Sequence, residues 1–105
     1  MRAVCRREGE KLMVSLSGEV DQHSSDGLRA RLDGLTEDPK IRRIEFDLEG
    51  VTLMDSSGIG VILGRYRRLS ERGGSMDIKG ASGSVERVLR VSGVYKLCTK
   101  GGAGA

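Results

Sequence analysis

The run Asp55-Ser56-Ser57-Gly58 holds the side chains best placed for chemistry in this chain of 105 residues. It follows the apolar segment 51–54 and precedes a helical pattern that begins near Ile59. A serine at the start of a helix lies beside free backbone N–H groups and the positive end of the helix dipole, so it can carry a phosphate with little strain. The run therefore suggests a phosphorylation switch.

A simpler interpretation of the same run is helix capping. Asp55 can serve as an N-cap whose carboxylate accepts the amide hydrogens of Ser57 or Gly58, a contribution of about 1 kcal/mol. Glycine spacing favours a further role, because Gly58, Gly60 and Gly64 each cost about 1 kcal/mol relative to alanine inside a helix. Gly60 and Gly64 share one face, where a neighbouring strand or a partner protein can approach the backbone closely.

The other reactive residues do not form a catalytic or metal-binding set. His23 is the single histidine, so neither a Ser-His-Asp nor a Cys-His arrangement is available, and we predict that the chain is not an enzyme. Cys5 and Cys98 are far apart and form no zinc or redox motif, so both are expected to be reduced, buried thiols. The glycines match neither G-x-G-x-x-G nor a P-loop, and no cofactor or metal is predicted.

Composition narrows the possible partners. The net charge of +3 comes from 18 basic against 15 acidic residues, which is too balanced for a general binder of polyanions. Only three residues are aromatic, so the stacking platform typical of single-stranded nucleic-acid binding is missing. No apolar run approaches the length of a membrane span, and the first residues lack the apolar core of a secretion signal. We expect a cytoplasmic protein that binds neither membrane nor nucleic acid.

The first third of the chain predicts a hairpin and a helix. A turn at Glu8-Gly9-Glu10 separates apolar runs at residues 3–5 and 12–16, which indicates two paired strands. Ser24 or Ser25 then caps a helix whose inward residues recur at helical spacing, namely Leu28, Leu32 and Leu35.

The middle of the chain predicts a strand followed by a long helix. The strand starts near residue 41 with one apolar face made of Ile44, Phe46 and Leu48. Gly50 interrupts it, and residues 51–54 form a short buried extension. The helix spans residues 57–72, with an inward face made of Ile59, Ile62, Leu63, Tyr66 and Leu69. Its arginines are expected to point mostly outward into solvent, as charged residues of a helix usually do. They are Arg65, Arg67, Arg68 and Arg72.

The remaining segments complete the predicted fold. A strand contains Met76 and Ile78, and a helix capped by Ser84 carries Val85, Val88 and Leu89 and ends at Gly93. Leu97 and Cys98 add a last short strand. Strands that alternate with helices predict an α/β fold in which a small mixed, mainly parallel sheet has helices packed against it. Residues 1–100 form one domain, and residues 101–105 form a flexible Gly/Ala tail.

Three stretches resemble the landmarks of a known family. The run from Met54 to Tyr66 closely resembles the signature of the STAS-domain anti-sigma factor antagonists, and within them the sporulation branch of the sigma-F pathway. Residues 18–24 are similar to the family's loop before the first helix, and residues 91–96 are similar to a third landmark. The resemblance covers about nine tenths of the chain, in order and without large gaps.

The resemblance implies both a function and a set of site residues. It implies that Ser56 is phosphorylated by an ATP-dependent serine kinase that is also the anti-sigma factor. The unphosphorylated form is then expected to bind this partner and release the sigma factor, while a metal-dependent serine phosphatase resets the switch. The docking surface is expected to include the residues flanking Ser56 and two on the landmark loop, which gives the set Asp21, Ser24, Asp55, Ser57, Gly58 and Gly60.

Two other functions remain open from the sequence. One is a STAS-domain adaptor in another partner-switching pathway, such as a stress response, which keeps the phosphoserine and changes the partner. The other is a small nucleic-acid-binding protein that uses Arg42, Arg43 and the helix arginines. An enzyme is the least favoured interpretation, because a second protein or a cofactor would have to supply the missing groups.

Overall fold

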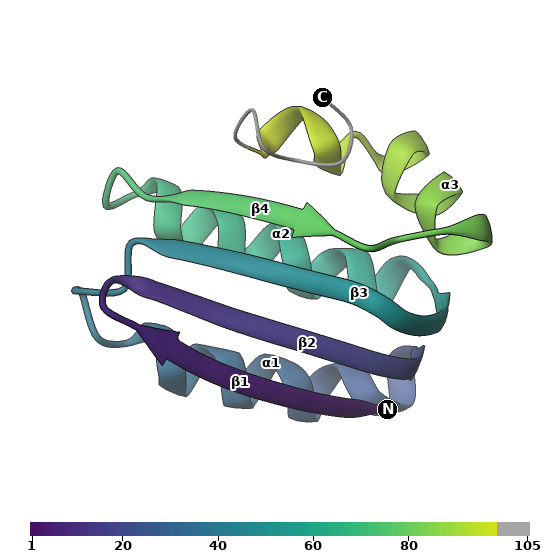
Figure 1. The fold of residues 1–105 in the computed structure, drawn as a ribbon, viewed down its shortest axis with the longest axis horizontal. Helices are drawn as coiled ribbons and strands as arrows, with labels where there is room; N and C mark the ends of the chain where they lie inside the picture. The colour runs from purple at the N-terminus through teal and green to yellow at the C-terminus, as the bar shows by residue number, and fades with distance from the viewer. Residues whose placement is uncertain (99–105) are drawn as a thin grey trace.

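Four strands form one mixed sheet in the order β1-β2-β3-β4 in the computed structural model, which describes residues 1–98 (Figure 1). β1 (Arg2–Glu8) and β2 (Lys11–Val20) form an antiparallel hairpin. β3 (Arg43–Met54) pairs in parallel with β2 and with β4 (Ser75–Lys79). The predicted α/β fold with a mixed, mainly parallel sheet is confirmed.

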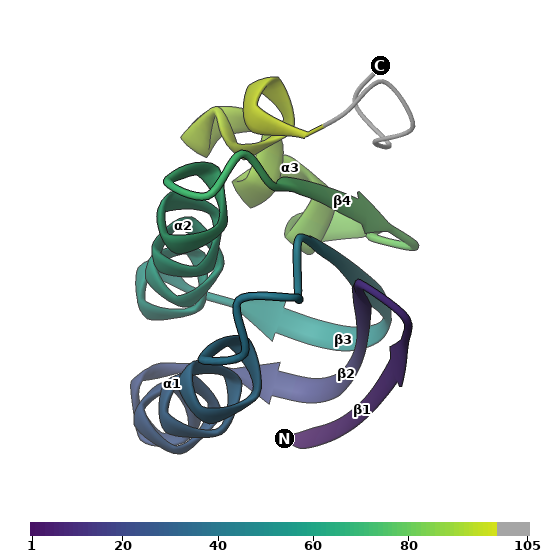
Figure 2. The same cartoon turned by 90° about the vertical axis from the view of Figure 1, so that its left-hand side faces the viewer.

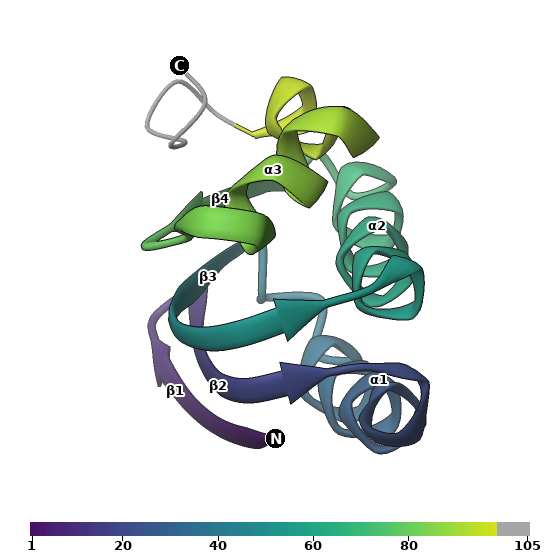
Figure 3. The ribbon, with the colours of Figure 1, turned by 90° about the vertical axis from the view of Figure 1, so that its right-hand side faces the viewer.

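Two long helices connect the parallel strands and lie on one face of the sheet. α1 (Gln22–Thr36) links β2 to β3, and α2 (Ser56–Ser70) links β3 to β4. Figures 2 and 3 show both helices on the same side of the sheet, next to each other. α3 (Gly83–Ser92) and the short 3-10 helix η1 (Val94–Leu97) lie at the β4 edge.

The core fills the space between the sheet and the two long helices. Alternate residues of the strands point into it, as the period of a strand requires. All of these strand residues are less than 4% exposed: Leu12, Val14, Leu16, Ile44, Phe46, Leu48, Met76 and Ile78. They pack in one cluster with Leu28 and Leu32 of α1 and with Ile59, Ile62 and Leu69 of α2.

The other face of the sheet carries mostly charged and polar side chains, together with Val4 and Met13. Glu45 on β3 lies between Lys11 of β2 and Lys79 of β4, at 3.3 and 3.4 Å. Arg43 and Asp77 form a third cross-strand pair at 3.6 Å. Opposite charges on neighbouring strands stabilise the pairing. The face away from the helices is thus suited to contact with water.

Gly50 does not interrupt β3, contrary to the expectation. β3 continues to Met54, and the register with β2 shifts between Ser15 and Ser17. A Cβ at Gly50 would lie 2.8 Å from the Cβ of Ser17, so the missing side chain permits the close approach of the two strands. Gly50 therefore marks a β-bulge, where glycine is common, and not the end of a strand.

Several predicted helix boundaries are wrong by one to four residues. α1 has its N-cap at Asp21, three or four residues before the predicted caps, and α3 has its N-cap at Ser82 rather than Ser84. α2 begins at Ser56 and ends at Ser70. The predicted end of α3 is confirmed, because Gly93 is its C-cap with a φ of +82°.

The outer parts of the core differ from the prediction in two places. Leu35 is 38% exposed, and Thr36 takes the inward place at the end of α1, where its hydroxyl donates to the carbonyl of Leu32 at 2.7 Å. The strand predicted at Leu97 and Cys98 is wrong, because the chain forms η1 there.

Both cysteines are free thiols, as predicted, but they are half-buried.

The prediction that Arg65 points outward is also wrong. Arg65 is buried, with 6% of the residue exposed, and its guanidinium lies 2.9 Å from the Asp33 carboxylate on α1. Arg72 is half-buried and donates to backbone carbonyls at the end of α1 and in the following loop. Arg67 is exposed and Arg68 is half-buried.

No helix within residues 1–98 combines the length and the apolar character needed to cross a bilayer. The predicted tail, 101–105, lies outside the described residues.

Candidate functional site

β2 and β3 end side by side, and each is followed at once by an aspartate that caps a helix. Val20 and Met54, the last residues of these strands, are partners in the sheet register. The amide of Asp55 donates to the carbonyl of Val20 at 3.2 Å, which holds the two strand ends together. Because parallel strands end at the same edge of a sheet, the two loops named in the sequence form one surface.

The first loop is stabilised by Asp21 and Ser24 acting on each other. The Asp21 carboxylate accepts from the amides of His23 and Ser24 at 2.9 and 3.2 Å. The Ser24 hydroxyl accepts from the Asp21 amide at 3.1 Å, which completes a capping box. Both side chains therefore shape the loop, and they are half-buried.

The second loop repeats this capping at the start of α2. One oxygen of the Asp55 carboxylate accepts from the amides of Ser57 and Gly58 at 2.9 and 3.4 Å, and also from the Ser57 hydroxyl. The predicted N-cap role of Asp55 is confirmed. These hydrogen bonds, the one from the Ser57 hydroxyl first, lower the pKa of Asp55. Asp55 is thus a carboxylate at neutral pH.

A fourth serine, which the sequence analysis did not assign to the site, joins the two helix starts. Ser25 is 2% exposed, and its hydroxyl donates to the carbonyl of Asp21 at 2.6 Å. The same hydroxyl lies 3.1 Å from the hydroxyl of Ser57. Its position was readable in the sequence, because Ser25 precedes Leu28 and Leu32 at the spacing of a buried helical stripe.

The two adjacent serines have different environments. Ser56 is exposed as the first residue of α2, and its hydroxyl has no hydrogen-bond partner within residues 1–98. Ser57 is half-buried, and its hydroxyl is engaged by Asp55 and Ser25. Ser56 is therefore the hydroxyl that an incoming group can reach without breaking the cap.

The glycines predicted for docking differ in the same way. Gly58 is buried, and a Cβ there would lie 2.8 Å from Cγ of Met54 and 2.9 Å from Cγ1 of Val20. Its lack of a side chain serves packing of α2 on the strand ends, and its place in the docking surface stays a prediction. Gly60 is exposed, and a Cβ at Gly60 or Gly64 would meet nothing within 4 Å. Among residues 1–98, no neighbour makes the tight internal approach considered for that pair.

An apolar hollow of about 400 Å³ adjoins Ser56. It lies between the start of α2 and α3, and Val91 of α3, on its wall, is 82% exposed. Arg87 of α3 lines the same hollow, so a cationic residue and Ser56 border one surface. The other apolar walls come from Met54, Ile59 and Val88. An exposed apolar surface beside a reactive polar group is typical of a protein-binding site.

The acidic residues at the two loops do not form a metal centre. No group of three or more His, Cys, Asp or Glu side chains in the described part of the chain is placed to hold a metal ion. Asp21 and Asp55 are each engaged by amides at a helix start. The geometry offers an accessible hydroxyl at a helix N-terminus, flanked by a carboxylate and an apolar surface.

The chain belongs to the STAS-domain family, because the sequence profile of the STAS domain matches residues 3–100. The resemblance read from the sequence is thereby confirmed. The particular relatives are anti-sigma factor antagonists. An anti-sigma F factor antagonist of Paenibacillus polymyxa is 41% identical over 86 residues, which is 82% of this chain and 74% of the relative. An anti-sigma-B factor antagonist of Bacillus subtilis is 32% identical over 86 residues, 82% of this chain and 77% of the relative.

Solved structures agree with this assignment. The Bacillus cell fate determinant SpoIIAA in its phosphorylated form superposes with a TM-score of 0.77 at 26% identity, covering 93% of this chain and 89% of that one. The unphosphorylated form of the anti-sigma factor antagonist SpoIIAA gives a TM-score of 0.74 at 27% identity, covering 85% and 82%.

Proposed function

We propose that this protein is an anti-sigma factor antagonist controlled by phosphorylation of Ser56. The unphosphorylated form binds an anti-sigma factor that is also a serine kinase, and the sigma factor is released. Phosphorylation ends this binding, and a metal-dependent serine phosphatase restores it. The chain acts as substrate and ligand in the cytoplasm, and its partners supply the catalysis. Both kinds of relative named above support the antagonist role.

The observation that carries the proposal is the difference between Ser56 and Ser57. Ser56 is exposed and its hydroxyl has no hydrogen-bond partner within the described chain, whereas the Ser57 hydroxyl is held by Asp55. In-line transfer requires the acceptor hydroxyl to approach the γ-phosphoryl group of ATP in a productive geometry. The exposed Ser56 hydroxyl is free to make this approach, whereas the Ser57 hydroxyl would first have to give up its hydrogen bond to Asp55, which supports Ser56 as the acceptor.

The added phosphate explains the loss of binding without a change of fold. It brings a charge of about −1.5 to −2 next to the ionised Asp55, while the amides at the start of α2 stabilise its oxygens. A switch from nearly full to nearly empty occupancy needs about 5.5 kcal/mol of differential affinity. Repulsion from an acidic group on the partner and the cost of desolvating the phosphate act together at this surface.

The docking surface that we propose combines the two loops with the apolar hollow on α3. Asp21, Ser24 and Asp55 shape the polar part, and Gly60 leaves an open place on the exposed side of α2. Val91 supplies apolar area that is exposed in the free protein. A phosphate on Ser56 lies at the junction of both parts, so it affects the whole contact.

The pathway is the one part of the proposal on which the relatives differ. The greater identity, 41%, favours a partner of the anti-sigma F type. The 32% identity to an anti-sigma-B factor antagonist supports the alternative, an adaptor in a stress pathway that works by the same chemistry. Comparing binding to an anti-sigma F and an anti-sigma B factor distinguishes the two.

The first experiment locates the phosphate. The purified protein is incubated with its anti-sigma factor and Mg-ATP, and the modified residue is identified by mass spectrometry. We expect one phosphate on Ser56, none on the Ser56→Ala variant, and continued modification of Ser56 in the Ser57→Ala variant. Phosphate on Ser57 in the unaltered protein would refute the proposal.

The second experiment measures binding of the anti-sigma factor. We expect Ser56→Ala to bind in the presence of ATP as the unmodified protein does without it, and Ser56→Asp to bind about tenfold more weakly or worse. Val91→Asp is expected to weaken binding about tenfold with stability changed by less than about 0.5 kcal/mol. Val4→Asp is the matched control, because Val4 is also exposed but lies on β1. Equal loss in both valine variants would exclude α3 from the contact.

A further inference from the structure

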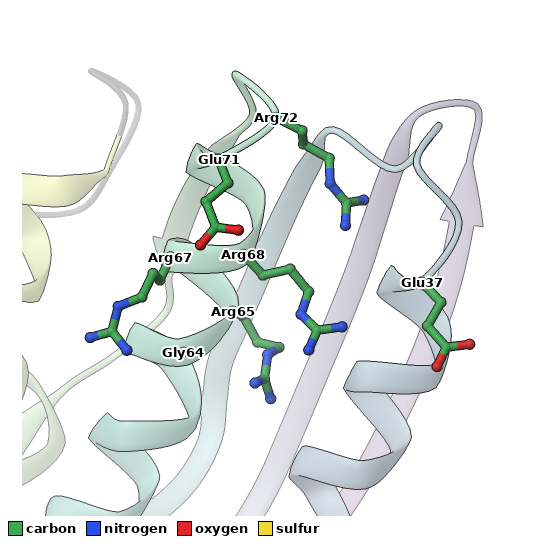
Figure 4. A pocket seen from close by; sticks show the side chains of 7 residues that line it. All are labelled: Glu37, Gly64, Arg65, Arg67, Arg68, Glu71 and Arg72. Atoms are coloured by element: carbon green, nitrogen blue, oxygen red, sulfur yellow. The ribbon is translucent and has the colours of Figure 1, made fainter.

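A hollow lined mainly by charged side chains lies at the opposite end of α2 from Ser56. Its volume is about 500 Å³, and it lies between the last turns of α2 and the end of α1 (Figure 4). Arg65 is nine residues beyond Ser56, a rise of roughly 14 Å along the helix. Six charged side chains line it: Glu37, Arg65, Arg67, Arg68, Glu71 and Arg72. The proposed function uses none of them.

Arg65 is buried at this hollow with most of its hydrogen-bonding capacity unused. Its side chain is 7% exposed, and Nη2 lies 2.9 Å from Oδ1 of Asp33. Nε and Nη1 are buried and have no hydrogen-bond partner in the described chain, and the same holds for Oδ1 of Asp33. The contact is thus an ion pair at short distance without hydrogen-bond alignment. A buried guanidinium ordinarily satisfies its N–H groups, so these donors indicate a missing acceptor.

The charge at this place is also unbalanced. Arg68 lies 3.6 Å from the same Oδ1 of Asp33 that pairs with Arg65, so two guanidinium groups share one carboxylate oxygen. Glu37 and Glu71 line the hollow but form no ion pair within residues 1–98, and Figure 4 shows the Glu37 side chain directed away from α2. One positive charge is therefore left over between Arg65 and Arg68.

The other two arginines have different positions. Arg72 donates to the carbonyls of Thr36, Asp38 and Ile41 at 2.9, 3.0 and 3.0 Å, so its guanidinium fixes the end of α1 and the loop after it. Figure 4 shows Arg67 pointing to the opposite side of α2 from Arg65 and Arg68. Of the four arginines that line the hollow, Arg65 and Arg68 are the two whose side chains are directed toward the space between the helices and whose donors are not fully used within the described residues (Figure 4).

We propose that this hollow binds a phosphate-type oxyanion, either free or as the end of a phosphomonoester. Arg65 forms the floor of the site, and Arg68, whose side chain is 40% exposed, forms its mouth and changes rotamer to admit the anion. Planar guanidinium groups match phosphate oxygens in charge and geometry. A small anion is favoured over a nucleic-acid strand, because two arginines are available and the carboxylates of Glu37 and Glu71 line the same hollow.

Titration with phosphate tests this site in the full protein. Sodium phosphate or glycerol 3-phosphate is added at constant ionic strength and pH, and ¹⁵N NMR follows the backbone amides and the arginine Nε–H signals. We expect saturable shifts at Arg65, Arg68 and the end of α1, with a Kd on the order of 1 mM. Similar binding of both compounds identifies a phosphomonoester end as sufficient, and binding of phosphate alone identifies the free anion.

Matched variants separate a site from a diffuse charge effect. Arg68→Gln is expected to weaken binding about tenfold, and Arg67→Gln, with the same change of charge on the same helix, less than twofold. Thermal unfolding of each variant checks that it is folded. The proposal is overturned by the absence of saturation up to roughly fifty times the expected Kd, by equal loss in the two variants, or by undiminished binding in Arg68→Gln.

Discussion

Alanine at Gly58 is expected to destabilise this protein, whereas alanine at Gly60 or Gly64 is expected to stabilise it. All three glycines lie in α2, so propensity alone predicts a gain of about 1 kcal/mol at each interior position. At Gly58 the new Cβ would lie 2.9 Å from Cγ1 of Val20 and 3.3 Å from the carbonyl oxygen of the same residue. Val20 is fully buried, and a β-branched side chain has little rotamer freedom with which to move away.

The magnitudes follow from these contacts. Overpacking a filled site costs about 1–3 kcal/mol, and the gain in propensity is smaller than 1 kcal/mol in the first turn, so Gly58→Ala has a net cost of about 1–2 kcal/mol. Gly60→Ala and Gly64→Ala meet nothing within 4 Å and keep the full gain. For a domain of this size, 1 kcal/mol corresponds to about 4–8 °C in Tm.

Thermal and urea unfolding of the three single variants measure these effects under one set of conditions. The expected order of Tm is Gly58→Ala below the unaltered protein, and the other two above it. A stabilised Gly58→Ala would refute the packing argument. Since Gly60 belongs to the proposed docking surface, Gly60→Ala is expected to bind the anti-sigma factor more weakly although it is more stable.

Three further predictions concern charged groups and thiols. Asp33→Asn removes the carboxylate beside buried Arg65 and is expected to lower the free energy of unfolding in urea by about 2–3 kcal/mol. The cost is less than for a fully buried pair because the Asp33 side chain is one-third exposed. An unchanged urea midpoint would show that the pair is not stabilising. Because the pKa of Asp55 is lowered in the folded protein, the ionised carboxylate stabilises the fold above the unfolded-state pKa of about 3.9, and this stabilisation is lost as the pH falls through the folded-state pKa. Asp55→Asn is therefore expected to flatten the acid limb of a plot of Tm against pH. An unchanged acid limb would contradict this. Burial raises the pKa of Cys98 to about 11, so iodoacetamide at pH 8 is expected to label Cys98 much more slowly in the folded than in the urea-unfolded protein, as mass spectrometry would show.

The succession of strands and helices and the helix start at Asp55 could be predicted because their signals are local. Alternating apolar residues such as Ile44, Phe46 and Leu48 specify one buried face of a strand, and Asp55 with its following glycine specifies a helix start. The pairing of β2 with β3 then brings Asp21 near Asp55. Function came mainly from the family resemblance, because a helix cap alone is compatible with many roles.

Features that depend on contacts between distant residues were missed. Arg65 was placed outward on account of its charge, although its spacing from Ile62 and Leu69 puts it on the buried stripe of α2. Its partner, Asp33, is on another helix and is not indicated by any local pattern. The bulge at Gly50 likewise depends on Ser17 in the neighbouring strand.

The hydroxyl contact between Ser25 and Ser57 has a consequence for the speed and specificity of association. It joins two helices that start 34 residues apart in the chain, one after Asp21 and the other after Asp55. This contact opposes independent movement of the two loops. A partner meets a surface whose shape exists before the encounter, so little conformational entropy is lost on association, and a protein with differently spaced contacts is rejected.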